Sequence, residues 1–225
     1  MKHVTWGLVM ATGRAEKISS AIETPFLYLN DRPVLAYSLA AFMQCAEIEG
    51  IIVVIPRERA ESVLGLVQML GLSKVKKIVV GGTRRSVAMA LGLEHMHDDV
   101  KWVCVHDASR PMVTPAQITE TVKCAWRNGS GVMTTEIGDP VVAANRNRIE
   151  SRMDGRAWAI ISPQAYSREV LDTVYPQIAK NRKNHADDLE AVMSVGVEPR
   201  LIPSATISLR IQSADDLAPA LALMK

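Results

Sequence analysis

Short runs of apolar, β-forming residues alternate with amphipathic stretches along most of this chain, and this alternation limits its fold more than any other feature. The runs that favour strands are Val4–Met10, Ile51–Ile55, Lys77–Val80, Trp102–Val105, Val132–Ile137, Ala159–Ser162, Arg200–Pro203 and Ile207–Ile211. The stretches that favour helices are Val34–Met43, Ala60–Leu70, Arg85–His97, a segment opened by the capping box Thr114-Pro115 with Gln117, Ser167–Lys180, Asp187–Ser194 and a last helix from Ser213. Strands and helices in turn at this spacing favour right-handed crossovers, so the sequence predicts an α/β fold with a doubly wound, mostly parallel sheet.

One segment, residues 138–158, interrupts this alternation of strand and helix patterns. It contains Gly138, Pro140 and Gly155, and it has few large apolar residues apart from its valines. It also carries four arginines, namely Arg146, Arg148, Arg152 and Arg156, which are either solvated or functional. We predict a hairpin arm that leaves the sheet. Since no stretch resembles an interdomain linker, the prediction is one domain over residues 1–225, with the arm inserted in it.

Composition excludes some classes of function. The formal net charge is only +2, which suggests no general binding to nucleic acid or membranes. The apolar part of the N-terminal segment is too short to span a bilayer and favours a first strand instead. Cys45, Cys104 and Cys124 lie in apolar segments without a C-x-x-C pair, so we expect buried, reduced thiols of a cytoplasmic protein.

The stretch Trp102–Pro111 is the strongest candidate for a site. Its apolar first half is typical of a strand buried on both faces, and His106, Asp107, Ser109 and Arg110 follow directly. The carboxyl ends of strands in open α/β sheets face the ligand crevice, where a carboxylate suits a divalent cation and an arginine suits phosphates. The alternatives are an Asp107 that merely starts a turn, a buried structural His106, and an Arg110 that serves as an ion-pair partner.

Two glycine-containing loops follow predicted strands. Ala11-Thr12-Gly13-Arg14, with Lys17 further on, follows the first strand, and Gly81-Gly82 is followed by Arg84, Arg85 and Ser86. Backbone N–H groups in such loops can bind phosphate. Neither the P-loop pattern nor G-x-G-x-x-G is present, so ordinary turns with surface arginines are the alternative.

In this order and spacing, the elements resemble the 2-C-methyl-D-erythritol 4-phosphate cytidylyltransferases, which belong to the nucleotide-sugar pyrophosphorylase-like group. The strongest points are Val105–Pro111 (VHDASRP) and Gly81-Gly82 with Ser86-Val87. Supporting points are Pro33–Leu35, Ser162–Tyr166 and Asp215–Leu217. The resemblance implies a Rossmann-like nucleotidyltransferase fold in which a substrate phosphate attacks the α-phosphate of CTP and releases pyrophosphate. It also implies a homodimer, in which the 138–158 arm reaches the active site of the neighbouring subunit.

The resemblance assigns roles to particular residues. Asp107 would hold Mg²⁺, and the nucleotide would be bound by Ala11, Thr12, Gly13, Gly81, Gly82, Ser86, Asp107 and Ala108. Arg110, Asp139 and Asp187 would bind the polyol phosphate. Lys17, Arg210 and Arg156 would supply catalytic positive charge.

The chain also departs from the family pattern. Pro25-Phe26 stands where the family has Pro-Lys, Asp139-Pro140 where it has Asp-Thr, and Asp154 where it has an arginine. Residues 186–189 keep only the first acid of Thr-Asp-Glu-Ala, and Arg210 replaces a lysine. Either Lys17 supplies the first lost cation or no residue does, and Arg152 or Arg156 would replace the lost arginine of the arm if the arm shifts.

These departures leave three functions open. The first is a working cytidylyltransferase that acts on a polyol phosphate, in isoprenoid precursor synthesis by resemblance. The second is a catalytically impaired paralogue that serves as a nucleotide-binding or assembly module. The third is a nucleotidyltransferase of the same fold that uses another base or a sugar phosphate.

Overall fold

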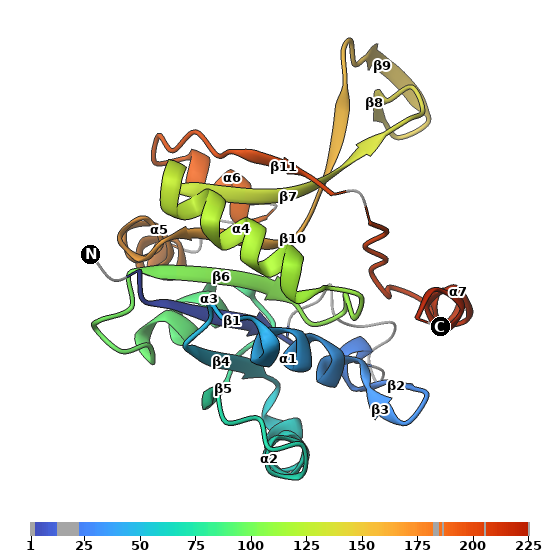
Figure 1. Ribbon diagram of the computed structural model, residues 1–225. Coiled ribbons are helices and arrows are strands. Elements are labelled where there is room, and N and C mark those ends of the chain that lie inside the picture. Colours follow the sequence, from blue (N-terminus) through green and yellow to red (C-terminus); the bar gives the residue numbers. More distant parts are fainter. Residues whose placement is uncertain (1–2, 13–22, 182–184, 186, 205, 225) are drawn as a thin grey trace.

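A seven-stranded sheet forms the centre of the molecule. The computed structural model describes residues 3–12, 23–181, 185, 187–204 and 206–224. The strand order is β11-β7-β10-β6-β1-β4-β5 (Figure 1). The bounds are β1 (Thr5–Met10), β4 (Gly50–Ile55), β5 (Val75–Val80), β6 (Trp102–Asp107), β7 (Ser130–Ile137), β10 (Ala157–Ser167) and β11 (Leu201–Pro203). Only β10 runs antiparallel to its two neighbours, so the predicted mostly parallel sheet is confirmed.

Helices cover both faces of the sheet. One face packs against α1 (Val34–Gln44), α2 (Ala60–Met69) and α4 (Pro115–Asn128), and the other against α3 (Arg85–Glu94), α5 (Arg168–Asn181) and α6 (Asp188–Met193). Side chains of β1 alternate between the two cores: Val9 points to the first, whereas Leu8 and Met10 point to the second. The doubly wound arrangement is therefore confirmed.

The ends of α4 follow from local sequence. Thr114 Oγ1 accepts the backbone N–H of Gln117 at 3.2 Å, and the Gln117 side chain accepts the N–H of Thr114 at 3.0 Å. At its other end the helix stops at Gly129, which has a φ of 83°. The predicted capping box is confirmed.

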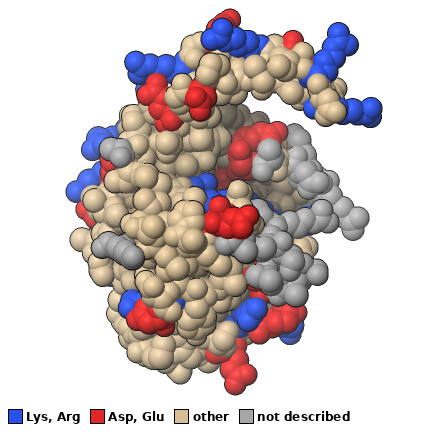
Figure 2. All heavy atoms as spheres, turned by 90° about the vertical axis from the view of Figure 1, so that its right-hand side faces the viewer, with Lys and Arg blue, Asp and Glu red and all other residues tan. Residues whose placement is uncertain are grey.

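The arm leaves the sheet where β7 and β10 stop pairing, at Ile137 and Ala157. It contains β8 (Val142–Asn145) and β9 (Arg148–Arg152), which pair antiparallel, and every residue of both strands is exposed. Figure 2 shows the arm overhanging a hollowed face of the molecule, with arginine side chains in blue along its length. The predicted hairpin arm is thus present, and no other described part of the chain covers β8 and β9.

The C-terminal part differs from the prediction in two places. Ile207–Ile211 forms no strand, because its one backbone–backbone hydrogen bond among the described residues runs from Ile211 N–H to the carbonyl oxygen of Ser109, at 2.9 Å. The last helix, α7 (Leu217–Leu223), begins after a short 3₁₀ turn, η4 (Ala214–Asp216), rather than at Ser213. The reason is that the Asp216 carboxylate accepts the backbone N–H groups of Gln212 and Ser213, each at 2.8 Å, and so closes a turn before the helix.

Smaller elements lie beside the sheet. They are η2 (Thr24–Phe26), β2 (Tyr28–Leu29), β3 (Arg32–Pro33) and η3 (Arg57–Arg59). Ile211 and Ala220 pack in one buried cluster with Leu29 and Val34, which joins α7 to the start of α1. All three cysteines are buried and unpaired, as predicted. Within the described ranges, no helix combines the length and the apolar character that a membrane span needs.

Candidate functional site

Asp107 ends β6, the strand beside β1 near the middle of the sheet. It lies opposite Met10 in the parallel register, so β1 and β6 end at the same edge. Strand β6 includes His106 and Asp107, two residues beyond the predicted end at Val105, and its backbone therefore holds the carboxylate directly. The side chain of Asp107 is only 13% exposed.

Three arginines from separate segments surround this carboxylate. Arg85 Nη1 lies 2.9 Å from Asp107 Oδ1, whereas Arg110 Nε and Arg210 Nη2 each lie 3.9 Å from Oδ2. Burial by itself would raise the pKa of Asp107, but the charges of Arg85, Arg210 and Arg110 outweigh it and hold the pKa at about 2. The carboxylate is therefore ionised at neutral pH, and the cluster around it carries excess positive charge, which suits a phosphate ligand.

A second buried carboxylate shares Arg85. The Nε atom of Arg85 donates to both oxygens of Asp188 at 3.1 Å, and Nη2 donates to Oδ2 at 2.6 Å. The hydroxyl of Tyr175, on α5, donates to Oδ1 of the same carboxylate. This chain of contacts joins α5 and α6 to the start of α3 and to the end of β6.

His106 fixes the turn that carries Asp107 and Arg110. Its ring is fully buried; Nδ1 lies 3.0 Å from Ser162 Oγ, and Nε2 lies 3.2 Å from the carbonyl oxygen of Arg110 and 3.2 Å from Ser38 Oγ. Burial lowers the pKa of His106 to about 4, so the ring is neutral at pH 7. With the proton assigned to Nε2, the ring donates to the Arg110 carbonyl and accepts from Ser162, whose oxygen accepts the backbone N–H of Asp107 at 3.1 Å. His106 thus has the structural position considered from sequence, and it holds both ends of the site turn.

Three of the residues expected beside the nucleotide directly follow strands at this sheet edge. The backbone N–H groups of Ala11, Gly81 and Ala108 donate to carbonyl groups of neighbouring strands at 2.8, 2.8 and 2.9 Å. Thr12 Oγ1 donates to the carbonyl oxygen of Gly82 at 3.1 Å and so ties the two loops together. Since those three amides are already used, a bound phosphate would meet N–H groups further along each loop.

The two glycines differ in their surroundings. A Cβ on Gly81 would lie 2.6 Å from Val54 Cγ1 and 3.0 Å from Thr12 Cγ2, so close packing requires a glycine here. A Cβ on Gly82 would have no atom within 4 Å, and this residue is exposed. Ser86 follows in the first turn of α3 and is half-buried. Gly82 is therefore accessible to solvent, and Ser86 is partly accessible.

The segment between β11 and α7 closes one side of the site. Arg110 Nη1 donates to the Ser208 carbonyl oxygen at 2.8 Å, and Arg210 Nε donates to Ser109 Oγ at 3.3 Å. These contacts hold Arg210 beside Asp107, although more than 100 residues separate the two in sequence.

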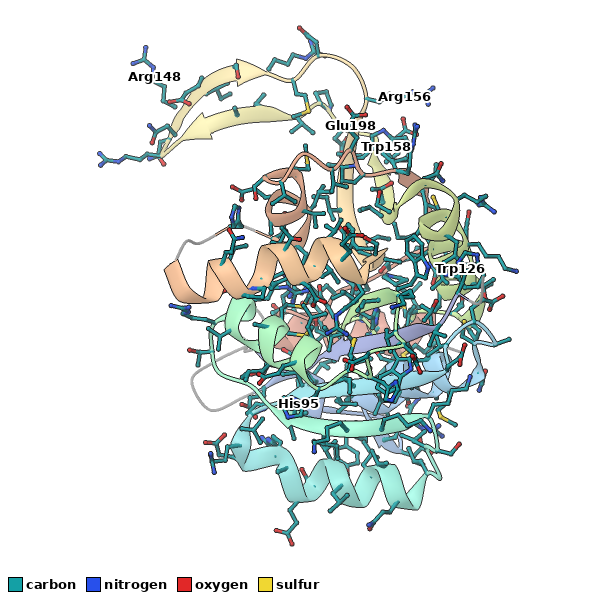
Figure 3. The ribbon with its side chains drawn as sticks, turned by 90° about the vertical axis from the view of Figure 1, so that its left-hand side faces the viewer. His95, Trp126, Arg148, Arg156, Trp158 and Glu198 are labelled. Atoms are coloured by element: carbon teal, nitrogen blue, oxygen red, sulfur yellow. The ribbon has the colours of Figure 1, made fainter. Side chains whose placement is uncertain are left out.

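Other predicted site residues lie elsewhere or outside the described residues. Asp187 accepts the backbone N–H of Glu190 at 2.8 Å and caps α6, and Asp139 is exposed on the arm. Arg156 is also exposed, near the base of the arm, where its Nε lies 3.5 Å from Glu136 (Figure 3). The structure thus brings none of these three into the Asp107 cluster of the same chain, as far as the described residues show. Gly13 and Lys17 lie outside those residues.

Phe26, which stands in place of a lysine, packs against an arginine. The guanidinium carbon of Arg59 lies 4.9 Å from the centre of the Phe26 ring, and Arg59 Nε forms an ion pair with Glu23 at 2.8 Å. Phe26 and Arg59 line an apolar hollow beside α2 together with Tyr28 and Met69. The substituted side chain therefore has a packing role in this chain.

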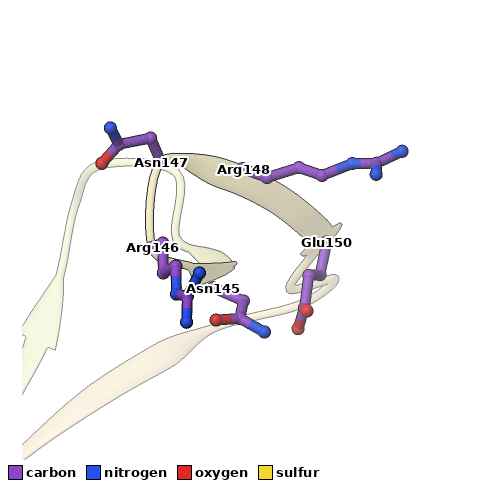
Figure 4. Close-up of a pocket in the computed structure, with 5 residues that line it drawn as sticks. All are labelled: Asn145, Arg146, Asn147, Arg148 and Glu150. Atoms are coloured by element: carbon purple, nitrogen blue, oxygen red, sulfur yellow. The ribbon is translucent and has the colours of Figure 1, made fainter.

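A shallow hollow lies at the tip of the arm. Asn145, Arg146, Asn147, Arg148 and Glu150 line it (Figure 4). Arg146 has a φ of 51°, in the left-handed region that a tight hairpin turn needs. Because these side chains come from a turn without a buried core, the hollow is an open surface.

The fit of a divalent cation depends on Asp107. No group of three or more His, Cys, Asp or Glu side chains in the described part of the chain is arranged to hold a metal ion. Asp107 Oδ1 is buried and, among the described residues, accepts no aligned hydrogen bond, although Arg85 lies close to it. Mg²⁺ is commonly held by one or two carboxylates with substrate phosphates completing its shell, so Asp107 fits as a single protein ligand.

From sequence, Arg85 was considered only as one of the arginines beside the glycine pair, and Asp188 and Ser162 had no role of their own. Each lay within a motif: Arg85 follows the glycine pair, Asp188 lies in the acidic pair before α6, and Ser162 opens a motif of the resemblance. The signal that pointed towards this position is the pair Arg84-Arg85, which follows the strand-end glycine pair after Thr83. The contact between Arg85 and Asp188 spans 103 residues and leaves no trace in local sequence.

Comparison with known proteins agrees with the fold and the motifs. Residues 6–225 match the model of the family described as 2-C-methyl-D-erythritol 4-phosphate cytidylyltransferase. Proteins of that name from Alkaliphilus metalliredigens (strain QYMF) and Caldanaerobacter subterraneus subsp. tengcongensis are 25% and 28% identical to this chain. The first match covers 93% of this chain and 88% of the relative, and the second covers 95% of each.

Solved structures share the architecture. The 4-diphosphocytidyl-2C-methyl-D-erythritol synthase of Anaerococcus prevotii DSM 20548 superposes with a TM-score of 0.85 at 18% identity, over 98% of this chain and 96% of that one. The 2-C-methyl-D-erythritol 4-phosphate cytidylyltransferase of Thermus thermophilus gives 0.76 at 21% identity, over 96% and 97%. These likenesses establish the fold, including its arm. Because the family model spans nearly the whole sequence, the chain belongs to the 2-C-methyl-D-erythritol 4-phosphate cytidylyltransferase family.

Proposed function

We propose that this protein transfers CMP from CTP to a polyol phosphate and releases pyrophosphate. The observation that carries the proposal is the ionised Asp107 carboxylate, which lies among Arg85, Arg110 and Arg210 at the sheet edge that also holds Gly81-Gly82. Such a cluster offers a cation ligand and positive charge at one place, which phosphoryl chemistry needs. Membership of a cytidylyltransferase family supports CTP as the donor.

In the proposed reaction, an oxygen of the acceptor phosphate forms a bond to the α-phosphorus of CTP. The bond between that phosphorus and the oxygen bridging to the β-phosphate breaks, and its electron pair leaves with pyrophosphate. Asp107 would hold Mg²⁺, which when bound would neutralise part of the triphosphate charge. Arg110 and Arg210, fixed through Ser208 and Ser109, would bind and orient phosphate oxygens on the same side.

The remaining assignments follow the positions of the loops. Ala11, Thr12 and Gly13 would lie along the nucleotide, with Gly81, Gly82, Ser86 and Ala108 beside the base and ribose. Lys17 would contact the triphosphate. Arg110, Asp139 and Asp187 would meet the acceptor. The close packing of the two loops through Thr12 and Gly82 supports a shared nucleotide pocket.

We also propose a homodimer in which the 138–158 arm of one subunit reaches the active site of the other. The fully exposed strands β8 and β9 support it, since isolated two-stranded hairpins are marginal in water. Arg156 would then act on the neighbour's substrate. In cells, the reaction would serve isoprenoid precursor synthesis in the cytoplasm, a compartment that the three buried, unpaired thiols support.

The test is pyrophosphate release from CTP with Mg²⁺ across a panel of polyol phosphates. The proposal is supported if the unmodified protein releases pyrophosphate and Asp107→Asn lowers the rate of release about 10²–10³-fold. Asp172→Asn is the matched control, because Asp172 pairs with Arg168 on an exposed face of α5. Release no faster than background with every acceptor would overturn it. A thermal-shift comparison of the four nucleoside triphosphates tests the base, and a clear preference for UTP or ATP would contradict the choice of CTP.

One observation favours a second candidate, a nucleotide-binding or assembly module without catalysis. Phe26 packs against Arg59, and Pro140 and Asp154 are exposed on the arm. The lysine, the threonine and the arginine of the family pattern therefore have no replacement at those positions. This candidate predicts a stable dimer and no turnover, and calorimetry that shows no CTP binding with the dimer intact would support it. Gain of activity in the triple variant Phe26→Lys, Pro140→Thr, Asp154→Arg would support it, whereas efficient turnover by the unmodified protein would exclude it.

A further inference from the structure

Arg85 lies between two carboxylates and holds them unequally. With Asp188 it forms a forked pair, in which Nε donates to both oxygens at 3.1 Å and Nη2 donates to Oδ2 at 2.6 Å. With Asp107 it makes one ion contact, from Nη1 to Oδ1 at 2.9 Å, and Oδ1 accepts no aligned hydrogen bond in the described part of the chain. The contact with Asp107 is therefore the weaker one.

Asp188 is itself fixed. It is 3% exposed, lies in the first turn of α6 and accepts the hydroxyl of the buried Tyr175. A guanidinium held by such a partner keeps its place when one of its other contacts is lost. Asp188 and Tyr175 thus act as the support from which Arg85 reaches Asp107.

We propose that Arg85 is a resident counter-ion of Asp107, which a divalent cation has to displace while Asp188 retains the guanidinium. The proposal rests on the metal-binding role of Asp107 in the proposed function. A Mg²⁺ ion held by Asp107 would compete with Arg85 for this carboxylate. The guanidinium nitrogen Nη1 lies 2.9 Å from Asp107 Oδ1, so the two cations would repel each other at short range.

This arrangement has a consequence for the order of binding. Without nucleotide, Arg85 already compensates Asp107, and a divalent ion gains little by entering. A nucleotide triphosphate brings further negative charge and oxygen ligands, so we expect metal and nucleotide to bind together. Arg85 is a positioning residue in this scheme, because it acts on the metal through Asp107.

The test is binding of Mn²⁺, followed by loss of the EPR signal of the free ion, with and without CTP. The double variant Arg85→Met, Asp188→Asn removes both charges of the pair, and the asparagine retains an acceptor for Tyr175. It should bind Mn²⁺ without CTP about tenfold or more tightly than the unmodified protein, since one nearby positive charge is gone. Arg168→Met, Asp172→Asn removes a partly exposed pair on α5 and serves as the matched control, with no change expected.

Asp188→Asn alone should act in the opposite direction. It leaves Arg85 charged but weakens its support, so the guanidinium moves onto Asp107, and Mn²⁺ binding in the presence of CTP should fall several-fold. A purely structural role of the pair would lower binding in both variants, and this result would overturn the proposal. Should the double variant fail to fold, the single variant decides: unchanged or tighter Mn²⁺ binding would overturn the proposal.

Asp107→Asn separates this inference from the proposed function. If it leaves Mn²⁺ binding unchanged, the metal role of Asp107 is wrong and the proposed function loses its cation site. If it abolishes binding while the double variant binds no more tightly than the unmodified protein, only the counter-ion role of Arg85 is wrong.

Discussion

The buried His106 should give the protein a pH-dependent stability that one substitution removes. Its pKa is about 4 in the folded protein, because burial disfavours the charged ring, against an ordinary value of 6.5. The unfolded chain therefore binds more protons between these values, so stability is full above pH 6.5 and falls as the pH drops towards 4. The whole difference of 2.5 pKa units corresponds to about 3 kcal/mol, of which about 2 kcal/mol is lost between pH 8 and pH 5.

The assay is urea unfolding at pH 8 and pH 5 in the presence of a chelator, comparing the free energies of unfolding. In His106→Gln, the loss between the two pH values should be about 2 kcal/mol smaller than in the unmodified protein, because glutamine does not titrate. The exposed His95, at the end of α3 (Figure 3), provides the control, and His95→Gln should keep the full pH dependence. An equal pH dependence in His106→Gln and the unmodified protein would refute the reasoning.

Three further substitutions, each with a control, test packing near the site and the cap of α4. Gly81→Ala should destabilise the protein by about 1–3 kcal/mol in denaturant unfolding, because its Cβ would meet Val54 at 2.6 Å, whereas Gly82→Ala should change stability by less than about 0.5 kcal/mol; equal effects would contradict the packing argument. Thr114→Ala should cost about 1 kcal/mol by the same measurement through loss of the α4 cap, with Thr114→Ser close to neutral. Ile211→Ala, at a fully buried position, should cost about 2–5 kcal/mol and weaken calorimetric CTP binding by loosening Arg210, while Ile207→Ala, 63% exposed, should do neither.

The framework of the fold was predictable because local sequence patterns determine its strands and helices. The run Ile51–Ile55 has no polar face, and the structure buries all of β4 on both sides. The box Thr114-Pro115 with Gln117 determined the start of α4 in the same way. In contrast, Ile207–Ile211 has a strand-like composition but meets no strand partner among the described residues. The Ser109 carbonyl group and the Arg110 side chain of the site turn hold this segment instead. Composition reports the preference of a segment, whereas pairing depends on distant residues.

The site was predictable only in part for the same reason. Asp107 and Arg110 follow a buried strand, so their place at a sheet edge could be deduced from neighbouring residues. The position of Arg210 beside Asp107 depends on the packing of α7 against Leu29 and Val34. The role of Arg85 depends on its pairing with Asp188. These contacts join segments more than 100 residues apart, and no local pattern encodes them.

Three of the positions at which this chain departs from its family lie on the arm or beside α2, whereas two others, Asp188 and Arg210, lie in the Asp107 cluster. Pro140 and Asp154 lie on the exposed arm, and Phe26 packs beside α2, whereas Asp107 and Gly81 lie in the closely packed sheet edge. A change at the packed edge would disturb the core, while a change on the arm costs little stability. Under the proposed homodimer, the arm is also the part that meets the acceptor. The acceptor is therefore the component of the proposed reaction that we expect to differ most from that of the relatives, and the panel of polyol phosphates is the experiment in which such a difference would be visible.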